Sequence, residues 1–351
     1  MRGFGMRKIN DVGWIEKEKP VAGPLDAIIK PTIIAPCSSD THTAHGGSGP
    51  KVDRILGHEA VGIVDSVGEL VTRFAPGDYV VVPCVTPDWL APGVQNSRTF
   101  SHDAKPFGSF KLMGQKDGTM AEFFHVNHAD ANLSPLPAGV SPEAALMTVD
   151  MMSTGFHGVE LAEVQYGETV VVIGIGPIGL MAIAGAALKG AGRIIAVGTR
   201  PKAIEVAREY GATEIISYKD GPVDKQIIEL THGGADKTII AGGNGETYTA
   251  AVRATHANGI ISNVNYFDCA DQLNLAALDW GLGMADKDIR GSFCPGGATR
   301  INQLLALIKY GRIDPTQIIS HRFHGFDKLP EAFELMDKKA PDLIKPVVYF
   351  D

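Results

Sequence analysis

A glycine-rich turn between an apolar run and a helical segment constrains the fold of this chain more than any other feature. Thr169–Ile173 is a mostly apolar run, which is typical of a parallel strand buried on both faces. It leads into Gly174-Ile-Gly-Pro-Ile-Gly179, and residues 178–189 are predicted as a helix that ends at Gly190. A glycine turn in this position is typical of a Rossmann dinucleotide-binding site. A glycine-rich turn in another kind of α/β protein is the alternative.

Strand and helix continue to alternate after this turn. Arg193–Val197 is predicted as the second strand, Pro201 suits the first turn of the next helix, and Gly211 suits its C-terminal end. Further elements are expected as strands at 214–217, 237–241 and 259–264 and as helices at 223–230 and 246–256. This alternation predicts an α/β fold with a doubly wound parallel sheet of about six strands.

The sequence on either side of this region has a different pattern. Short β-rich runs separated by glycine and proline, such as Ala60–Gly68, are typical of an irregular β-barrel. Leu343–Phe350 is predicted as a strand interrupted by proline, which fits poorly in a central parallel sheet and belongs with the first domain. We predict one domain from residues 1–152 and 295–351, a nucleotide-binding domain at 153–294, and an active site in the cleft between them.

A cysteine and a histidine in the β-rich region predict a zinc site. Cys37 and His58 offer a thiolate and an imidazole, and catalytic zinc takes a third protein ligand while one position stays open. Asp150 is the best third candidate, because its carboxylate lies in an apolar stretch where burial is costly unless the group is paired or bound to metal. The thiolate, the neutral imidazole and the carboxylate together carry a charge of about −2, which neutralises Zn²⁺, and a second carboxylate would leave the site negative. Glu59 is therefore predicted as a supporting group or a transient ligand.

Cys37 and His58 each have an alternative interpretation when taken alone. An isolated cysteine is more often a small apolar residue of the core than a ligand. A histidine at a strand edge is often held by hydrogen bonds. The occurrence of both residues in one chain with a dinucleotide motif favours the metal site.

The glycine turn and the end of the second predicted strand indicate which dinucleotide binds. Gly174 permits the tight bend, Gly176 lets the backbone approach the pyrophosphate, and Gly179 lets the helix pack closely on the strand. The helix N-terminus then faces the phosphates with its partial positive charge, which adds Pro177 and Ile178 to the predicted cofactor site.

An NAD enzyme places Asp or Glu at the end of the second strand, about twenty residues after the fingerprint. This chain has Gly198, Thr199 and Arg200 there, with Tyr218 at the end of the next strand. Gly198 leaves space for a 2′-phosphate, Thr199 offers a hydroxyl, and Arg200 offers the forked donors that suit a phosphate. We therefore predict that the cofactor is NADP(H). The alternative interpretation of Arg200 is a solvated arginine at the start of a helix.

Bulk properties exclude several classes of protein. A length of 351 residues suits two domains, and a net charge of −8 offers no basic surface for nucleic acid. We find neither a signal-peptide pattern in the first ten residues nor a long uncharged apolar stretch, so a cytoplasmic protein without a membrane segment is expected. The scattered positions of Cys37, Cys84, Cys269 and Cys294 argue against a disulfide framework and a four-cysteine zinc site.

These features together resemble the zinc-containing medium-chain alcohol dehydrogenases, and specifically the tetrameric NADP-dependent secondary alcohol dehydrogenases. The resemblance runs nearly end to end. Its motifs are Gly13-Trp-Ile-Glu16, Pro36-Cys37, Asp40-Thr-His42, Ile55-Leu-Gly-His-Glu-Ala-Val-Gly62, Thr86-Pro-Asp-Trp89, Thr154-Gly-Phe-His-Gly158, Val172-Ile-Gly-Ile-Gly176 and Cys294-Pro-Gly-Gly297.

The resemblance implies a GroES-like β-barrel catalytic domain joined to a Rossmann domain, and a homotetramer. It implies zinc ligands at Cys37, His58 and Asp150, with Glu59 as an occasional fourth. Around the 2′-phosphate it implies Gly198, Thr199, Arg200 and Tyr218, and it places Thr154 against the nicotinamide. Residues Leu90–Phe110 contain no cysteine where the wider family carries a structural zinc, so one catalytic zinc per subunit is expected.

The implied reaction is the reversible oxidation of a small secondary alcohol, such as 2-propanol or 2-butanol, with hydride passing to NADP⁺. Ser39 is expected to take the hydroxyl proton and pass it to His42, although Ser39 could instead cap a helix and His42 could be a solvated histidine. Residues proposed for the pocket walls, with a role in the core as the alternative, are Val85, Trp89, Phe110 and Cys294. A zinc-dependent polyol dehydrogenase and a non-catalytic NADPH-binding protein are the competing functions.

Overall fold

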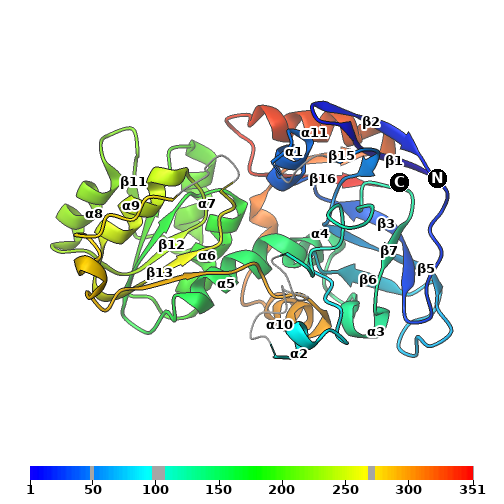
Figure 1. Cartoon of the computed structure of the whole chain (residues 1–351), viewed down its shortest axis with the longest axis horizontal. Helices are drawn as coiled ribbons and strands as arrows, with labels where there is room; N and C mark the ends of the chain where they lie inside the picture. Colours follow the sequence, from blue (N-terminus) through cyan, green and yellow to red (C-terminus); the bar gives the residue numbers. More distant parts are fainter. Residues whose placement is uncertain (48–50, 97–106, 268–272, 351) are drawn as a thin grey trace. The chain divides into compact units, whose positions relative to one another are not determined.

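Two compact units make up the structure, a computed structural model that describes residues 1–47, 51–96, 107–267 and 273–350 (Figure 1). Unit 1 comprises Met1–Ser153 and Cys294–Asp351, and unit 2 comprises Thr154–Phe293, limits that lie one residue from the expected domain limits. Ser153 Oγ donates to the carbonyl oxygen of Pro295 at 3.2 Å, so the chain leaves and re-enters unit 1 at neighbouring points.

A six-stranded parallel sheet forms the centre of unit 2, in the order β11-β10-β9-β12-β13-β14. Its strands are β9 (Thr169–Ile173), β10 (Arg193–Val197), β11 (Glu214–Ile216), β12 (Ala235–Ile240), β13 (Thr255–Asn263) and β14 (Asp288–Gly291). The strand order reverses beside β9, and sheets of this type bind ligands at the carboxyl ends of the strands at such a switch point. The predicted doubly wound sheet is confirmed.

Five α-helices in the described part of unit 2 accompany this sheet. They are α5 (Ser153–Leu161), which begins at the last residue of unit 1, α6 (Pro177–Leu188), α7 (Pro201–Glu209), α8 (Val223–Thr231) and α9 (Gly245–Ala254), and a short 3₁₀ turn, η2, spans Gly281–Gly283. Helix α6 packs against β9 and β10, and α9 packs against β12 and β13. The buried core of the unit is formed mainly by aliphatic side chains of the strands, among them Val171, Ile195 and Ile240.

Unit 1 contains a seven-stranded sheet and a three-stranded sheet. The larger sheet has the order β15-β16-β3-β5-β6-β8, with β7 paired to β3, and the smaller has the order β2-β1-β4. The strands are β1 (Arg2–Lys8), β2 (Asp11–Glu16), β3 (Ala27–Ile34), β4 (Arg54–Ile55), β5 (Ala60–Val67), β6 (Tyr79–Val82), β7 (Phe124–Val126), β8 (Ser134–Pro135), β15 (Ile319–His324) and β16 (Lys345–Tyr349). The antiparallel pairing of β3 with β5 and of β5 with β6, with register shifts between β3 and β5, agrees with the predicted irregular β-barrel.

Most helical segments of unit 1 are shorter than ten residues, and α1 and η1 border the candidate site. They are α1 (Ser38–Ala44), α2 (Pro92–Asn96), α3 (Ala129–Asn132), α4 (Pro142–Met147), the π-helical turn η1 (Thr148–Met152), α10 (Ala298–Lys309), α11 (Leu329–Lys338) and the 3₁₀ turns η3 (Pro315–Ile318) and η4 (Phe326–Lys328). Helix α11 contacts both α1 and β16. These contacts bring residues from both segments of unit 1 together.

Strand β16 places the C-terminal segment in the larger sheet of unit 1. It lies between β15, to which it is parallel, and β3, to which it is antiparallel (Figure 1). Pro346 pairs with His321 of β15, whereas the pairing with β3 begins only at Val348. The missing amide hydrogen of Pro346 therefore removes no hydrogen bond from the β3 side of the sheet.

Candidate active site

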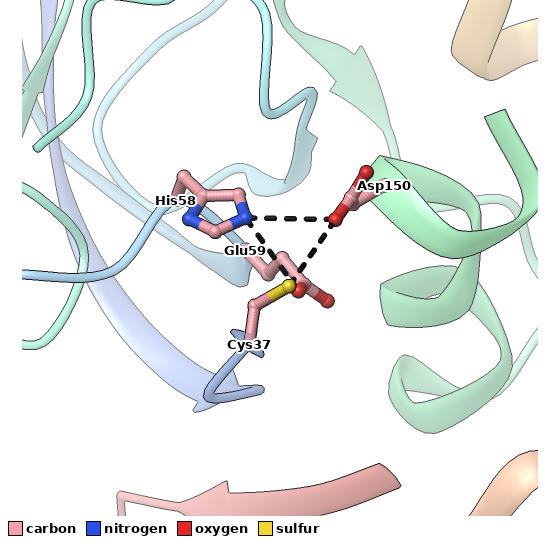
Figure 2. A group of neighbouring side chains, drawn as sticks. All are labelled: Cys37, His58, Glu59 and Asp150. Carbon is pink, nitrogen blue, oxygen red and sulfur yellow. Dashed lines mark hydrogen bonds and ion pairs between the residues drawn. The ribbon is translucent and has the colours of Figure 1, made fainter. Parts of the chain in front are cut away.

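Four potential metal ligands from separate parts of unit 1 converge in the structure (Figure 2). Cys37 precedes α1, His58 and Glu59 lie between β4 and β5, and Asp150 lies in η1. One donor atom from each residue lies within 4.8 Å of all the others, and all four residues are buried. The structure thus brings together every metal ligand expected from the sequence.

The distances between donor atoms match those around a bound metal ion. His58 Nε2 lies 3.5 Å from Asp150 Oδ2 and 3.8 Å from Glu59 Oε1. Cys37 Sγ lies 3.7 Å from the same oxygen of Asp150. Two ligands at about 2.0–2.3 Å from a tetrahedral zinc lie about 3.3–3.8 Å apart, so these separations suit that ion.

Asp40, which the sequence did not single out as a site residue, joins the two segments that carry Cys37 and His58. Its Oδ2 accepts a hydrogen bond from the Cys37 amide at 2.8 Å, and its Oδ1 accepts one from the Gly57 amide at 3.0 Å. Oδ1 also lies 3.4 Å from His58 Nδ1. This is an ion-pair distance, and His58 Nδ1 has no hydrogen-bond partner among the described residues. The carboxylate therefore lies behind the imidazole, while Nε2 faces the metal position. In the sequence, Asp40 belongs to the motif Asp40-Thr-His42, and in the structure it lies in the first turn of α1.

A local change of helix type positions Asp150. Helix α4 continues into the π-helical turn η1, in which Asp150 is the central residue, and then into α5. Such turns widen a helix by one residue and occur frequently at functional sites. The apolar residues around Asp150 therefore stay buried while its carboxylate points toward His58 and Cys37 (Figure 2).

Lys345 is a second buried residue of the site that the sequence did not reveal. Its Nζ donates to Glu59 Oε1 at 2.5 Å, and the two side chains are 1% and 0% exposed. Burial raises the pKa of Glu59 to about 7, although the attraction of Lys345 opposes this rise. Burial alone would lower the pKa of Lys345, but Cys37, Glu59 and Asp150 together hold it above its usual range. The ammonium group thus offsets the charge of Glu59.

The residues present fit a cation. Within the part of the chain that the structure describes, Glu59 Oε2 is buried and has no hydrogen-bond partner. Burial opposes a charge on His58, yet Asp40 and Asp150 raise the pKa of its imidazole well above the ordinary value. This is the response of a buried basic group to excess negative charge, which a divalent cation would neutralise. One sulfur, one nitrogen and carboxylate oxygens form a donor set that zinc commonly takes.

Ser39 and His42 lie on α1 beside this cluster. Cys37, and not Ser39, occupies the N-cap position of the helix, so the capping alternative for Ser39 is wrong. Ser39 Oγ lies 3.4 Å from His58 Nε2. His42 follows three residues later, which places it on the same side of the helix, and it is half-buried.

The residues proposed as pocket walls have different surroundings. The ring of Phe110 meets the imidazole of His58 edge to face, with centroids 5.3 Å apart. Trp89 Nε1 donates to Asn132 Oδ1 at 3.0 Å, which gives this indole a structural contact. Val85 and Cys294 are buried, and Cys294 Sγ lies 3.5 Å from Cys84 Sγ.

The glycine turn in unit 2 has the backbone that a pyrophosphate site requires. Gly174 has φ +94°, which favours glycine, and a Cβ on Gly179 would lie 1.8 Å from the carbonyl oxygen of Gly174. A Cβ on Gly176 would meet nothing within 4 Å, so the space beside it is open. Pro177 and Ile178 begin α6 and direct its N-terminus toward this turn.

The predicted 2′-phosphate corner combines a glycine with three polar side chains. A Cβ on Gly198 would lie 2.1 Å from Ile175 Cγ1, so a larger residue would clash with the isoleucine of the glycine turn. Thr199 Oγ1 donates to the Tyr218 hydroxyl at 2.9 Å. Arg200 is half-buried beside them, and burial lowers the pKa of its guanidinium while Tyr218 opposes this effect. Thr154, the residue expected at the nicotinamide, is buried in α5.

Comparison with known proteins identifies the family. Residues 23–138 match the alcohol dehydrogenase GroES-like domain, and residues 177–310 match the zinc-binding dehydrogenase family. The chain is 53% identical over 350 residues to the NADP-dependent isopropanol dehydrogenase of Thermoanaerobacter brockii, covering 99% of each protein. The protein of the same name from Clostridium beijerinckii is 51% identical, again over 99% of each chain.

Solved structures agree with this result. The alcohol dehydrogenase TADH from Thermus sp. ATN1 superposes with a TM-score of 0.88 at 28% identity, and each chain is covered completely. The chain therefore belongs to the zinc-containing medium-chain alcohol dehydrogenases, as its motifs indicated. The GroES-like domain and the Rossmann sheet predicted from the sequence are confirmed. Within the described residues, no helix is long and apolar enough to cross a membrane.

Proposed function

We propose that this protein is an NADP-dependent secondary alcohol dehydrogenase, which reversibly transfers a hydride between NADP(H) and small secondary alcohols or ketones such as 2-propanol and acetone. The convergence of buried Cys37, His58 and Asp150 on one space carries the proposal. The names of the relatives from T. brockii and C. beijerinckii support the substrate and the cofactor. When bound, zinc supplies Lewis acidity that lowers the pKa of an alcohol hydroxyl and polarises a ketone carbonyl.

The residues around the metal ligands have separate tasks in this proposal. Asp40 holds the His58 imidazole so that Nε2 remains available as a ligand. Lys345 keeps Glu59 at a distance set by their ion pair, so the permanent ligands remain one thiolate, one imidazole and one carboxylate. Phe110 covers one edge of the imidazole with an apolar ring.

Proton transfer is assigned to Ser39 and His42. Ser39 Oγ lies at the metal-facing nitrogen of His58, which is where a substrate hydroxyl must release its proton. The half-buried His42, one helical turn away, then exchanges that proton with solvent. A histidine suits this task because its ordinary pKa is close to neutral.

In unit 2, the cofactor supplies the hydride acceptor or donor, and the protein supplies its binding site. The turn with Gly174, Gly176, Pro177, Ile178 and Gly179 is assigned to the pyrophosphate, and Thr154 to the nicotinamide. The Thr199, Arg200 and Tyr218 side chains, beside Gly198, are assigned to the 2′-phosphate, because a guanidinium and two hydroxyls complement its charge and its acceptors.

Three further properties belong to this proposal, of which the first two rest on the family resemblance. We propose a single catalytic zinc per subunit with no structural zinc, a homotetramer, and a location in the cytoplasm. Zinc analysis of the purified protein and light scattering during gel filtration test the first two.

The decisive experiment follows NADPH absorbance with acetone or 2-butanone, before and after zinc is removed by a chelator. Turnover with these ketones that is lost on chelation and restored by zinc supports the proposal. Turnover only with sugars or polyols indicates a polyol dehydrogenase. NADPH binding without turnover of any of these compounds indicates a non-catalytic binding protein.

A further inference from the structure

A second group of potential ligands lies directly beside the first. Cys84 Sγ and Cys294 Sγ are 3.5 Å apart, and both residues are 1% exposed. Cys84 Sγ also lies 3.9 Å from Asp150 Oδ1. These three donor atoms lie within 4.8 Å of one another, and the dehydrogenase mechanism uses neither cysteine as a ligand.

The backbone holds this arrangement in place. Cys84 follows β6, and its amide donates to the carbonyl oxygen of Val149, the residue before Asp150, at 3.2 Å. Cys294 is the first residue of the second segment of unit 1. The two thiols thus come from parts of the chain that are 210 positions apart and meet only because unit 1 is folded.

The distance between the sulfur atoms suits a shared metal ion. Two thiolates on a tetrahedral zinc, each at about 2.3 Å, lie about 3.8 Å from each other. A disulfide bond requires a separation of about 2.05 Å. The observed 3.5 Å is therefore within a few tenths of an ångström of metal coordination and far from a covalent bond.

The two oxygens of Asp150 face different ligand groups. Oδ2 lies near His58 Nε2 and Cys37 Sγ, whereas Oδ1 lies near Cys84 Sγ. A carboxylate in this position can bridge two cations that are about 3.5–4 Å apart, as in two-metal enzymes.

The charges of the combined site also balance two cations. Four anionic ligands, from Cys37, Cys84, Asp150 and Cys294, neutralise two divalent ions, while the imidazole of His58 adds no charge. Glu59 and Lys345 form an ion pair and cancel each other. Such neutrality matters because every one of these groups is buried.

We propose that Cys84, Cys294 and Asp150 form a second metal site for a thiophilic divalent cation such as Cd²⁺ or Zn²⁺, with Asp150 shared between the two sites. Sulfur ligands favour such ions over Mg²⁺ or Ca²⁺, which take oxygen ligands.

The test counts metal ions and does not depend on turnover. Full-length protein is loaded with zinc, freed of excess metal and titrated with Cd²⁺, while ultraviolet cadmium–thiolate absorbance is recorded and bound cadmium and zinc are both measured. We expect the parent protein to gain one further metal equivalent together with the thiolate absorbance. The double variant Cys84→Ala/Cys294→Ala is expected to gain neither and to keep its zinc.

Matched variants make the result specific. Cys269→Ala removes one thiol from unit 2 and is expected to bind cadmium as the parent does. Cys84→Ser, which preserves size, is expected to weaken the second equivalent by at least about 10-fold, and it replaces the double variant if that protein does not fold.

Three results would overturn the proposal. In the first, the parent protein gains no second equivalent. In the second, the double variant binds the same metal with the same absorbance. In the third, the parent protein is lighter by two hydrogen atoms because Cys84 and Cys294 are joined in a disulfide. Failure of acetone reduction, in contrast, affects the proposed function alone.

Discussion

Breaking the buried ion pair between Glu59 and Lys345 tests how the site is held together. The charged atoms are 2.5 Å apart, and neither side chain is more than 1% exposed. At an effective dielectric constant of about 20, two unit charges at this distance attract by about 7 kcal/mol. Desolvation offsets part of this attraction, and deleting one partner of a buried pair costs about 3–5 kcal/mol. We expect Lys345→Met to lower the free energy of unfolding of unit 1 by this amount.

Urea unfolding of the zinc-chelated protein, followed by tryptophan fluorescence, measures the effect. Trp14 and Trp89 lie in unit 1 and Trp280 lies in unit 2, so a Trp280→Phe background reports on unit 1 alone. The matched control is Glu59→Gln/Lys345→Met, which removes both charges and leaves neither group unpaired. We expect this double variant to be more stable than Lys345→Met, because a neutral replacement of a buried pair costs little.

The pH dependence provides a second check. Lys345 opposes the rise in the pKa of Glu59, which stands at about 7, so removing Lys345 raises this pKa further. In the folded Lys345→Met variant, Glu59 keeps a proton that it releases near pH 4.5 in the unfolded chain. The stability of this variant therefore falls as pH rises from about 4.5 to the raised pKa of Glu59. The stability gap between variant and parent is expected to widen from about pH 7 to about pH 9. A loss below about 1 kcal/mol at every pH would refute the role assigned to this pair.

Three further changes test other parts of the molecule. Arg200→Gln removes a charged hydrogen-bond donor from the 2′-phosphate site, and such a bond contributes about 1.5–3 kcal/mol to binding. KM for NADPH is therefore expected to rise roughly 10- to 100-fold, while KM for NADH stays constant. Ser39→Ala is expected to lower kcat about 100-fold without loss of bound zinc, and unchanged kcat would exclude this serine from proton transfer. Burial lowers the pKa of Lys116 to about 7 against the attraction of Asp26, so the unfolded chain binds more protons above that pH. The free energy of unfolding is therefore expected to rise from about pH 7 to about pH 10. In Lys116→Met, the melting temperature is expected to lack the part of this pH dependence that Lys116 supplies.

Unit 2 could be predicted closely because its elements carry local signals. Strands β9 and β10 begin and end at the expected residues, since each is an apolar run bounded by glycine or polar residues. Helix α6 begins one residue before the expected position, at Pro177, which suits a first helical turn. Strand β14 was missed because Asp288–Gly291 is short and polar and, among the described residues, pairs with β13 alone.

The candidate site could be predicted only where the chemistry of a residue is visible in the sequence. Cys37 and His58 are ligand types within recognisable motifs, and Asp150 is an unusual charge in an apolar run. Lys345 meets Glu59 from 286 positions away, and no periodicity reports a contact of that separation. Asp40 resembles any acidic residue in a first helical turn, so its contacts with Cys37 and Gly57 appear only in the fold.

The chain leaves and re-enters unit 1 at neighbouring points, Ser153 and Pro295, and this closeness has a consequence for folding. Pairing β3 with β16 in an otherwise unfolded chain closes a loop of about 300 residues, at an entropic cost that grows with its length. Once unit 2 has formed its own sheet, residues Thr154–Phe293 are already folded, which shortens that loop by nearly half. We expect unit 2 to refold first. The pairing of β16 with β3 is expected to follow in a slower phase, and high affinity for zinc is gained only then.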